Sequence, residues 1–197
     1  MRQSFVAACC ALLISCGGGE GGDVSKGTGE IGAKGLSGTQ GVWLNDVLSS
    51  YYGLKYALVD ADSARADSMA AVLKSACDSA VMPSMANDSA TFIVMGNLLG
   101  DLSSECSGFG REPSLEARRR SFNMMGEHLY PLLQAAGYDG GQVYRQVCPM
   151  AFNDNEKAGW LSDSREIVNP YLGRKHPKYS AGMLHCGELE DSLTKVK

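Results

Sequence analysis

Two short stretches late in the chain carry the side chains best suited to bind a soft metal ion. Cys148-Pro149-Met150 holds a thiol and a thioether, and Met183-Leu184-His185-Cys186 holds a thioether, an imidazole and a thiol. Sulfur donors favour Cu(I) over harder divalent ions, and zinc, whose structural sites ordinarily use Cys and His, is the second candidate. We therefore expect a Cu(I) site with Cys148 and Cys186 as principal ligands. The candidate metal ligands are Cys148, Met150, Met183, Cys186 and, as an extra ligand, His185.

The two cysteines also have a structural interpretation. Exported proteins commonly join cysteines in disulfides, and methionines commonly fill cores. The alternative is therefore a non-catalytic structural or protein-interaction module with a Cys148–Cys186 disulfide in place of a metal site, and a redox role for the pair is a third hypothesis. Strand geometry constrains the metal hypothesis, because residues two apart in a strand face the same side. Cys148 and Met150 can point together, whereas Met183 and Cys186 require a turn or bulge near Cys186.

No motif of a familiar catalytic site is present. The chain has no haem-attachment Cys-x-x-Cys-His, no zinc-protease His-Glu-x-x-His, no P-loop and no Gly-x-Ser-x-Gly. Of its 3 histidines, His176 is expected in a loop and His128 on the polar edge of a helix, and Ser162, Asp163 and Ser164 fit a turn. We therefore predict no enzymatic activity and no catalytic residues.

The charge pattern gives no support for nucleic-acid binding. The formal net charge is -4, and the one dense positive run is Arg118-Arg119-Arg120. At helical spacing these three side chains fan around much of a turn, which predicts a solvated face rather than a binding patch.

The first residues predict export and lipid attachment. Arg2 precedes an apolar run from Phe5 to Ile14, which has the length of a signal-peptide core and is too short to cross a bilayer. The sequence Leu13-Ile14-Ser15-Cys16 resembles the lipobox of bacterial lipoproteins, which implies cleavage before Cys16 and its acylation, for example with palmitate. An ordinary signal peptide with incidental cysteines is the alternative. Because Gly17 rather than Asp follows Cys16, we expect the lipoprotein to be anchored in the outer membrane. The sequence does not decide between the periplasmic and the surface face.

Composition divides the remainder into a tether and one domain. Residues 16–41 follow the predicted signal peptide, 1–15; they are rich in glycine and poor in large apolar residues, which predicts a flexible tether. Residues 42–197 are numerous enough to form one domain with its own core. The lipid on Cys16 would hold that domain near a membrane.

Periodic apolar residues predict four helices, and therefore a mainly α fold with an up-down four-helix bundle. Their expected spans are about 42–59, 62–81, 88–108 and 113–137. The expected starting residues are Asp60 or Asp62, Asn87 or Asp88, and Pro113, and the expected closing glycines are Gly108, Gly110 and Gly137. The inward-facing stripes include Val72 and Phe92. Cys77 and Cys106 lie on facing stripes. A disulfide between them and a pair of buried, unpaired thiols are the two alternatives.

The residues after the helices lose the helical period and predict a small, irregular β cap over about 142–186. Val143 to Cys148 alternates as a strand does, and Trp160-Leu161 and Met183 to Cys186 are expected to pair with it. Residues 187–197 are expected to form a short polar helix or a frayed tail.

Several of these blocks resemble an uncharacterised family, a domain of unknown function. The resemblance rests on Tyr51-Tyr52-Gly53-Leu54-Lys55-Tyr56-Ala57, Cys148-Pro149-Met150-Ala151-Phe152, Gly159-Trp160-Leu161-Ser162-Asp163, Asn169-Pro170-Tyr171 and the closing Cys186-Gly187. The family occurs in bacterial periplasmic lipoproteins and is appended to periplasmic adaptor subunits of heavy-metal (copper and silver) efflux systems. The resemblance covers roughly Leu44 to Leu193 and is most specific in its last third. The segment 174–182 is longer than the family pattern implies.

The resemblance implies a helical domain, an extracytoplasmic location and a link to copper, and it nominates the same four sulfur-bearing residues. We therefore expect a lipid-anchored binding protein for Cu(I) or a similar soft heavy-metal ion, which sequesters the ion or passes it to an efflux system. The expected partners are the membrane, through the lipid, and a heavy-metal efflux complex.

Overall fold

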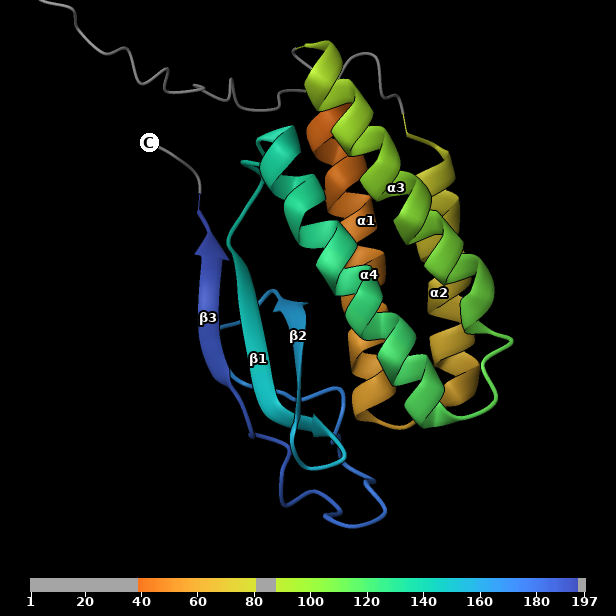
Figure 1. The fold of residues 1–197 in the computed structure, drawn as a ribbon, viewed down its shortest axis with the longest axis vertical. Helices are drawn as coiled ribbons and strands as arrows, with labels where there is room; N and C mark the ends of the chain where they lie inside the picture. The colour runs from red at the N-terminus through yellow and green to blue at the C-terminus, as the bar shows by residue number, and fades with distance from the viewer. Residues whose placement is uncertain (1–38, 81–87, 195–197) are drawn as a thin grey trace, which may run out of the picture. The chain divides into compact units, whose positions relative to one another are not determined.

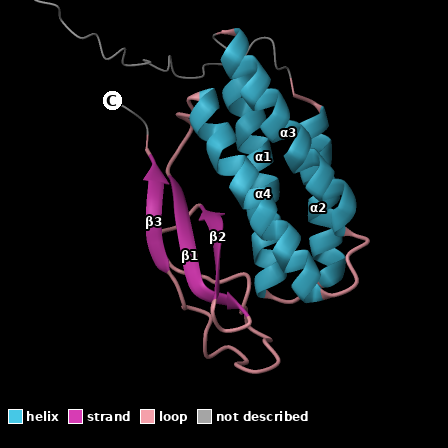
Figure 2. Cartoon of the chain, in the orientation of Figure 1, coloured by secondary structure: helices cyan, strands magenta, loops and turns pink. Residues whose placement is uncertain are grey.

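The computed structural model describes residues 39–80 and 88–194, which form four helices followed by a three-stranded sheet (Figures 1 and 2). The helices are α1 (Thr39–Val59), α2 (Ser63–Asp78), α3 (Ser89–Phe109) and α4 (Leu115–Ala136), and the strands are β1 (Val143–Phe152), β2 (Glu156–Ser162) and β3 (Glu188–Leu193). A mainly helical fold with a small C-terminal sheet is thus confirmed. The predicted signal peptide, Cys16 and most of the predicted tether lie outside the described residues.

Side-chain caps set the starts of three helices. The carboxylate of Asp62 accepts a hydrogen bond from the Arg65 N–H at 3.0 Å, and that of Asp88 accepts one from the Thr91 N–H at 2.9 Å. Ser114 caps α4 in the same way, so that helix begins just after Pro113. Asp62 and Asp88 are thus confirmed among the predicted starting residues, whereas α4 is capped by Ser114 rather than opened by Pro113.

Three further boundaries differ. α1 begins at Thr39, so residues 39–41 of the predicted tether are helical. α2 ends at Asp78 rather than near 81, and Gly108 lies inside α3, which Gly110 closes.

The core forms where the predicted apolar stripes meet, and successive helices pack against one another. Two stripe residues were predicted wrongly, since Val72 is 49% exposed and Phe92 is 42% exposed. α2 instead buries a stripe at helical spacing that leaves Val72 outside it: Ala66, Ala70, Leu73 and Cys77. In α3 the buried stripe begins only at Met95, one turn after Phe92.

The sheet is antiparallel with strand order β2-β1-β3. The predicted strands at Val143–Cys148 and Trp160–Leu161 lie within β1 and β2. The prediction for Met183 to Cys186 was wrong, because this segment is a turn in which the Cys186 N–H donates to the Met183 carbonyl at 3.0 Å. The third strand is Glu188–Leu193, where a polar helix or frayed tail was expected. Its charged residues pair with the free edge of β1, as in the 2.8 Å ion pair between Arg145 and Glu190.

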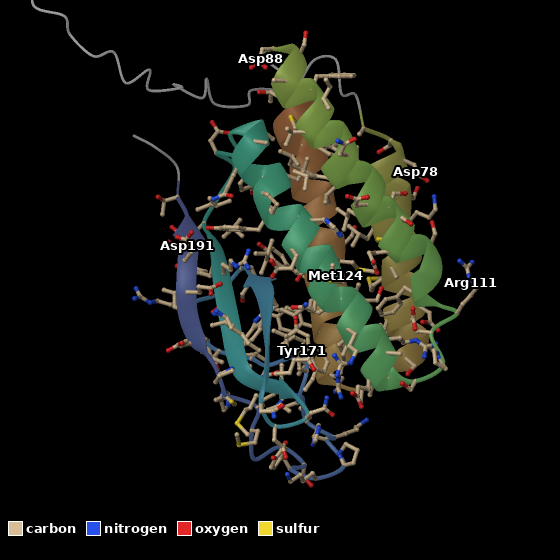
Figure 3. All side chains as sticks on the ribbon, viewed as in Figure 1. Asp78, Asp88, Arg111, Met124, Tyr171 and Asp191 are labelled. Carbon is tan, nitrogen blue, oxygen red and sulfur yellow. The ribbon has the colours of Figure 1, made fainter. Side chains whose placement is uncertain are left out.

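Buried aromatic and polar side chains join the helices to the sheet. Strand β2 packs against α4, and α2 and α3 lie on the side away from the sheet (Figure 1). Tyr171, which Figure 3 labels between the sheet and α4, stacks edge-on against Phe152 and Trp160 at 5.3 and 5.9 Å between ring centres. Lys55 of α1 is buried and donates to the Ser162 hydroxyl at 3.0 Å and the Asp163 carboxylate at 3.1 Å.

The arginine run in α4 is not the solvated face that its sequence predicted. Arg119 is buried and donates to the carbonyl oxygens of Pro170 and Leu58. Arg118 forms two hydrogen bonds with Asp67. In the described part of the chain, no helix combines the length and the apolar character needed to cross a bilayer.

Candidate metal-binding site

The fold brings the two sulfur-bearing stretches together. The Sγ atoms of Cys148 and Cys186 lie 3.2 Å apart, although the residues are 38 positions apart in sequence, and both are free thiols. Cys148 is fully buried and Cys186 is partly exposed. The pair therefore has one sheltered sulfur and one that solvent can approach.

Strand register accounts for this meeting. The last partner of β1 in β3 is Val147, opposite Glu188, so the chain just before β3 runs beside the residues just after Val147. On the other edge, the regular pairing of β1 with β2 is interrupted between Cys148 and Phe152. A proline in that interval cannot donate to a ladder, and an irregularity there re-aims the neighbouring side chains.

Asn169 ties down the backbone of Cys186. Its side chain is fully buried; the Nδ2 group donates to the Cys186 carbonyl at 2.7 Å, and Oδ1 accepts from the backbone N–H groups of Tyr171 and Leu172. Its own N–H donates to the Leu184 carbonyl at 2.8 Å. This one amide thus links the turn before β3 to the Asn-Pro turn. The Asn-Pro motif is visible in the sequence, but its contact with the Cys186 carbonyl is not.

Gly187 permits the close approach of the two stretches. Its φ of +147° suits glycine, and a Cβ atom there would lie 2.8 Å from the Val147 carbonyl oxygen and 2.9 Å from the Trp160 ring. A side chain at this position would push Cys186 away from β1. The glycine that follows the cysteine was the available sequence signal.

The remaining candidate ligands lie near the two cysteines in sequence. Met150 follows Cys148 by two residues, and Met183 precedes Cys186 by three. Both methionine side chains are partly buried and pack against the core. His185 is exposed, and its Nδ1 atom lies 2.8 Å from the Ile167 carbonyl oxygen. Among residues 39–80 and 88–194, no three His, Cys, Asp or Glu side chains are grouped to hold one ion. The thioethers of Met150 and Met183 therefore remain the candidate third ligands.

Burial and contact with Cys148 keep the Cys186 thiol protonated. Burial, followed by the hydrogen bond with Cys148, raises the pKa of Cys186 to about 11. Nucleophilic and redox-active cysteines ordinarily have lowered pKa values, so this environment is the opposite of a catalytic one. A bound soft cation would displace the proton, since the thiolate is the ligand.

The sulfur separation lies between the values for a metal site and for a disulfide. Two sulfurs bound to one ion stand up to about 4.6 Å apart, twice a metal–sulfur bond of about 2.3 Å. A disulfide requires about 2.05 Å. From 3.2 Å, either state needs a shift of roughly one ångström, and Cys186 lies outside regular structure, where such a shift is feasible.

A second cysteine pair lies within the helices. Cys77 of α2 and Cys106 of α3 are both buried and both free. Hydrogen bonding with Cys77, together with burial, raises the pKa of Cys106. The predicted facing positions are confirmed by this hydrogen bond, and the two residues are free thiols in the structure.

The chain is similar to one known family over its helical region. The model of a family described as "Protein of unknown function (DUF3347)" matches residues 47–141, from within α1 to just before β1. This supports the resemblance to an uncharacterised family for the helices, whereas the motifs around Cys148 and Cys186 lie beyond the matched region. No curated protein and no solved structure matches the chain.

Proposed function

We propose that this protein is a lipid-anchored, extracytoplasmic binding protein for Cu(I) or a similar soft heavy-metal ion. The observation that carries the proposal is the 3.2 Å contact between the free thiols of Cys148 and Cys186. The cysteines supply the principal ligands, and Met150 and Met183 are the nearest thioethers in sequence. Soft, low-coordinate donor sets of this kind select Cu(I).

The exposure of the pair suits a site that exchanges its ion. Cys186 is partly exposed while Cys148 is sheltered, so an ion can arrive and leave on the side of Cys186. In the described residues, no histidine, carboxylate or further cysteine is grouped with the two thiols. These residue types therefore do not enclose the ion. Such a site can sequester Cu(I) or transfer it to a heavy-metal efflux system.

Attachment to a membrane would make transfer efficient. The lipobox-like Leu13 to Cys16 supports acylation of Cys16, and Gly17 supports the outer membrane. A flexible tether then raises the local concentration of the domain near a membrane complex. The four helices, which we take as an up-down bundle, serve as the scaffold, and the proposal requires no enzymatic activity.

An anaerobic Cu(I) competition titration tests the proposal. Wild type, Cys148→Ser and Cys186→Ser compete with a chromophoric Cu(I) chelator, and Cys77→Ser serves as the matched control from the other cysteine pair. Loss of either ligand is expected to weaken binding by at least about 100-fold, more than the loss of an outer-shell contact, while the control is unchanged. Equal affinities in all four proteins would remove the proposal.

The alternative is a structural or protein-interaction module in which Cys148 and Cys186 form a disulfide. The same short contact favours it, because exported proteins meet an oxidising environment. Alkylation of the purified protein without reductant, followed by mass measurement, separates the two. Two alkylated thiols at these positions support the metal site, and a quantitative disulfide supports the structural module.

A further inference from the structure

A cavity of about 320 Å³ lies at the N-terminal end of α4. Its walls come from the first turn of that helix, from the end of β1 and from the segment 174–182. Leu115, Phe152, Tyr171 and Pro177 give it an apolar lining. Small-molecule sites in proteins have this size and character, with a few placed polar groups.

One wall carries a buried positive charge that the Glu116 carboxylate attracts but does not contact in an ion pair. Arg119 is 5% exposed, and its Nε and Nη2 groups donate hydrogen bonds to two backbone carbonyls. Among the residues that the structure describes, no carboxylate forms an ion pair with it and its Nη1 group has no acceptor. Its neighbours Arg118 and Arg120 pair with Asp67 and Glu156. Burying an unpaired charge is costly, so Arg119 would gain from an anion in the cavity.

Arg119 remains charged at neutral pH, since burial lowers its pKa only to about 10. The one carboxylate on the cavity wall is that of Glu116, which accepts a hydrogen bond from Arg120 at 3.4 Å. Its charge is therefore already shared with a cation outside the lining. The first turn of α4 adds N–H groups and the positive end of the helix dipole.

The segment 174–182 forms the opposite wall, through Lys175, His176 and Pro177. Lys178 and Tyr179 both bond to the Asp154 carboxylate in the turn between β1 and β2. The ring of His176 stacks on Tyr179 at 5.1 Å, and its Nδ1 accepts backbone N–H groups, so the neutral ring carries its proton on Nε2. This anchoring holds His176 and Lys175 at the cavity. Lys175 has no ion-pair partner in the described part of the chain.

We propose that this cavity binds a small organic carboxylate, with the carboxylate group at Arg119 and Lys175 and an apolar body against Phe152 and Tyr171. Arginine and lysine match the charge, and the apolar lining excludes a bare, strongly hydrated anion. This site is independent of the proposed metal function. It gives the unusual segment 174–182 a binding role.

Isothermal titration calorimetry on the full chain in non-ionic detergent tests the proposal with three probes at neutral pH. Benzoate is the carboxylate, benzamide is its neutral isostere and inorganic phosphate is the bare anion. Benzoate is expected to bind at least about tenfold more tightly than either of the others, the size of one charged hydrogen bond. No heat of binding with benzoate up to about 20 mM, or equal affinity for benzamide or phosphate, would overturn the proposal.

Variants locate the site. Lys175→Gln is expected to weaken benzoate binding about threefold to tenfold, as the loss of one partly exposed charge should. The matched control is Arg174→Gln, since Arg174 is the adjacent exposed cation, pairs with Asp60 and does not line the cavity. Arg119→Gln is expected to abolish binding; because that variant can also unfold, the comparison of Lys175→Gln with Arg174→Gln decides. An equal effect of these two substitutions would contradict the assignment.

Discussion

At the scale of single residues, the position of Cys186 depends on two neighbours that carry no metal-binding group. The Asn169 amide holds the Cys186 carbonyl, and Gly187 lets the backbone pass Val147 and Trp160. Both act on the backbone, so they position the Cys186 thiol and would not contact the proposed ion. Their substitution should therefore affect stability and Cu(I) affinity together.

Replacing Asn169 by alanine removes a donor and an acceptor from a fully buried place. The N–H groups of Tyr171 and Leu172 lose their acceptor, so we expect a loss of about 2–3 kcal/mol in the free energy of unfolding. Urea denaturation measures this, with Asn155→Ala in the exposed turn after β1 as the control. A loss no larger than that of the control would show that the amide does not hold the turn.

Glycine substitutions give a second contrast. Gly187→Ala meets a carbonyl oxygen at 2.8 Å at a positive φ, so it should destabilise the fold by roughly 2 kcal/mol or more. Gly100→Ala in α3 meets nothing within 4 Å and should stabilise the helix by about 0.5–1 kcal/mol. Thermal unfolding of both variants compares them. Opposite signs are expected, and a neutral Gly187→Ala would contradict the close approach.

The sulfur pair was predictable from residue types, whereas its supporting residues were not. Cys148 and Cys186 stand out because each lies within three residues of a methionine in the sequence. Asn169 and Arg119 bond to backbone carbonyls that are remote in sequence, and no local pattern marks such partners. Arg119 consequently resembled its exposed neighbours in the sequence.

At the scale of elements, helices were more predictable than strands. Caps such as Asp62 and Asp88 and the periodic apolar stripes are local, so they predict helix starts well. Strand β3 is short, polar and exposed, and it forms because the edge of β1 is available for pairing. Its sequence carries no alternation that would reveal this.

Two substitutions of Lys55 test what joins α1 to the end of β2. Its stem is buried, and its ammonium pairs with Asp163, whose side chain is 49% exposed. Lys55→Ala should cost about 2–4 kcal/mol, because it leaves a cavity. Lys55→Met keeps the stem and removes a costly buried charge, so its effect should be under about 1 kcal/mol. Urea unfolding of the two variants decides, and equal losses would mean that the ion pair, rather than packing, makes the joint.

At the scale of the whole described region, carboxylates tie the sheet together and to α4. Hydrogen bonds from Lys157 and Tyr130 lower the pKa values of Glu190 and Asp191, and one from Arg120 lowers that of Glu156. A carboxyl group whose pKa is lower in the folded state stabilises the fold above its ordinary pKa. That contribution is lost as pH falls through the lowered value.

Stability should therefore decline below about pH 4.5, where these carboxylates take up protons. Thermal unfolding followed by circular dichroism measures the decline. In the variant Glu190→Gln/Asp191→Asn the decline should be shallower, because two of the linked groups no longer titrate. An unchanged slope would show that the contacts of β3 with β1 and α4 do not depend on these charges.

The central claim is that Cys148 and Cys186 bind one soft cation together. X-ray absorption at the copper edge, on protein loaded with one equivalent of Cu(I) without oxygen, tests it most directly. We predict a first shell of sulfur alone, two or three atoms at about 2.3 Å, that disappears in the Cys148→Ser/Cys186→Ser variant. A shell of nitrogen or oxygen atoms in wild type, or the same sulfur shell in the double variant, would contradict the account.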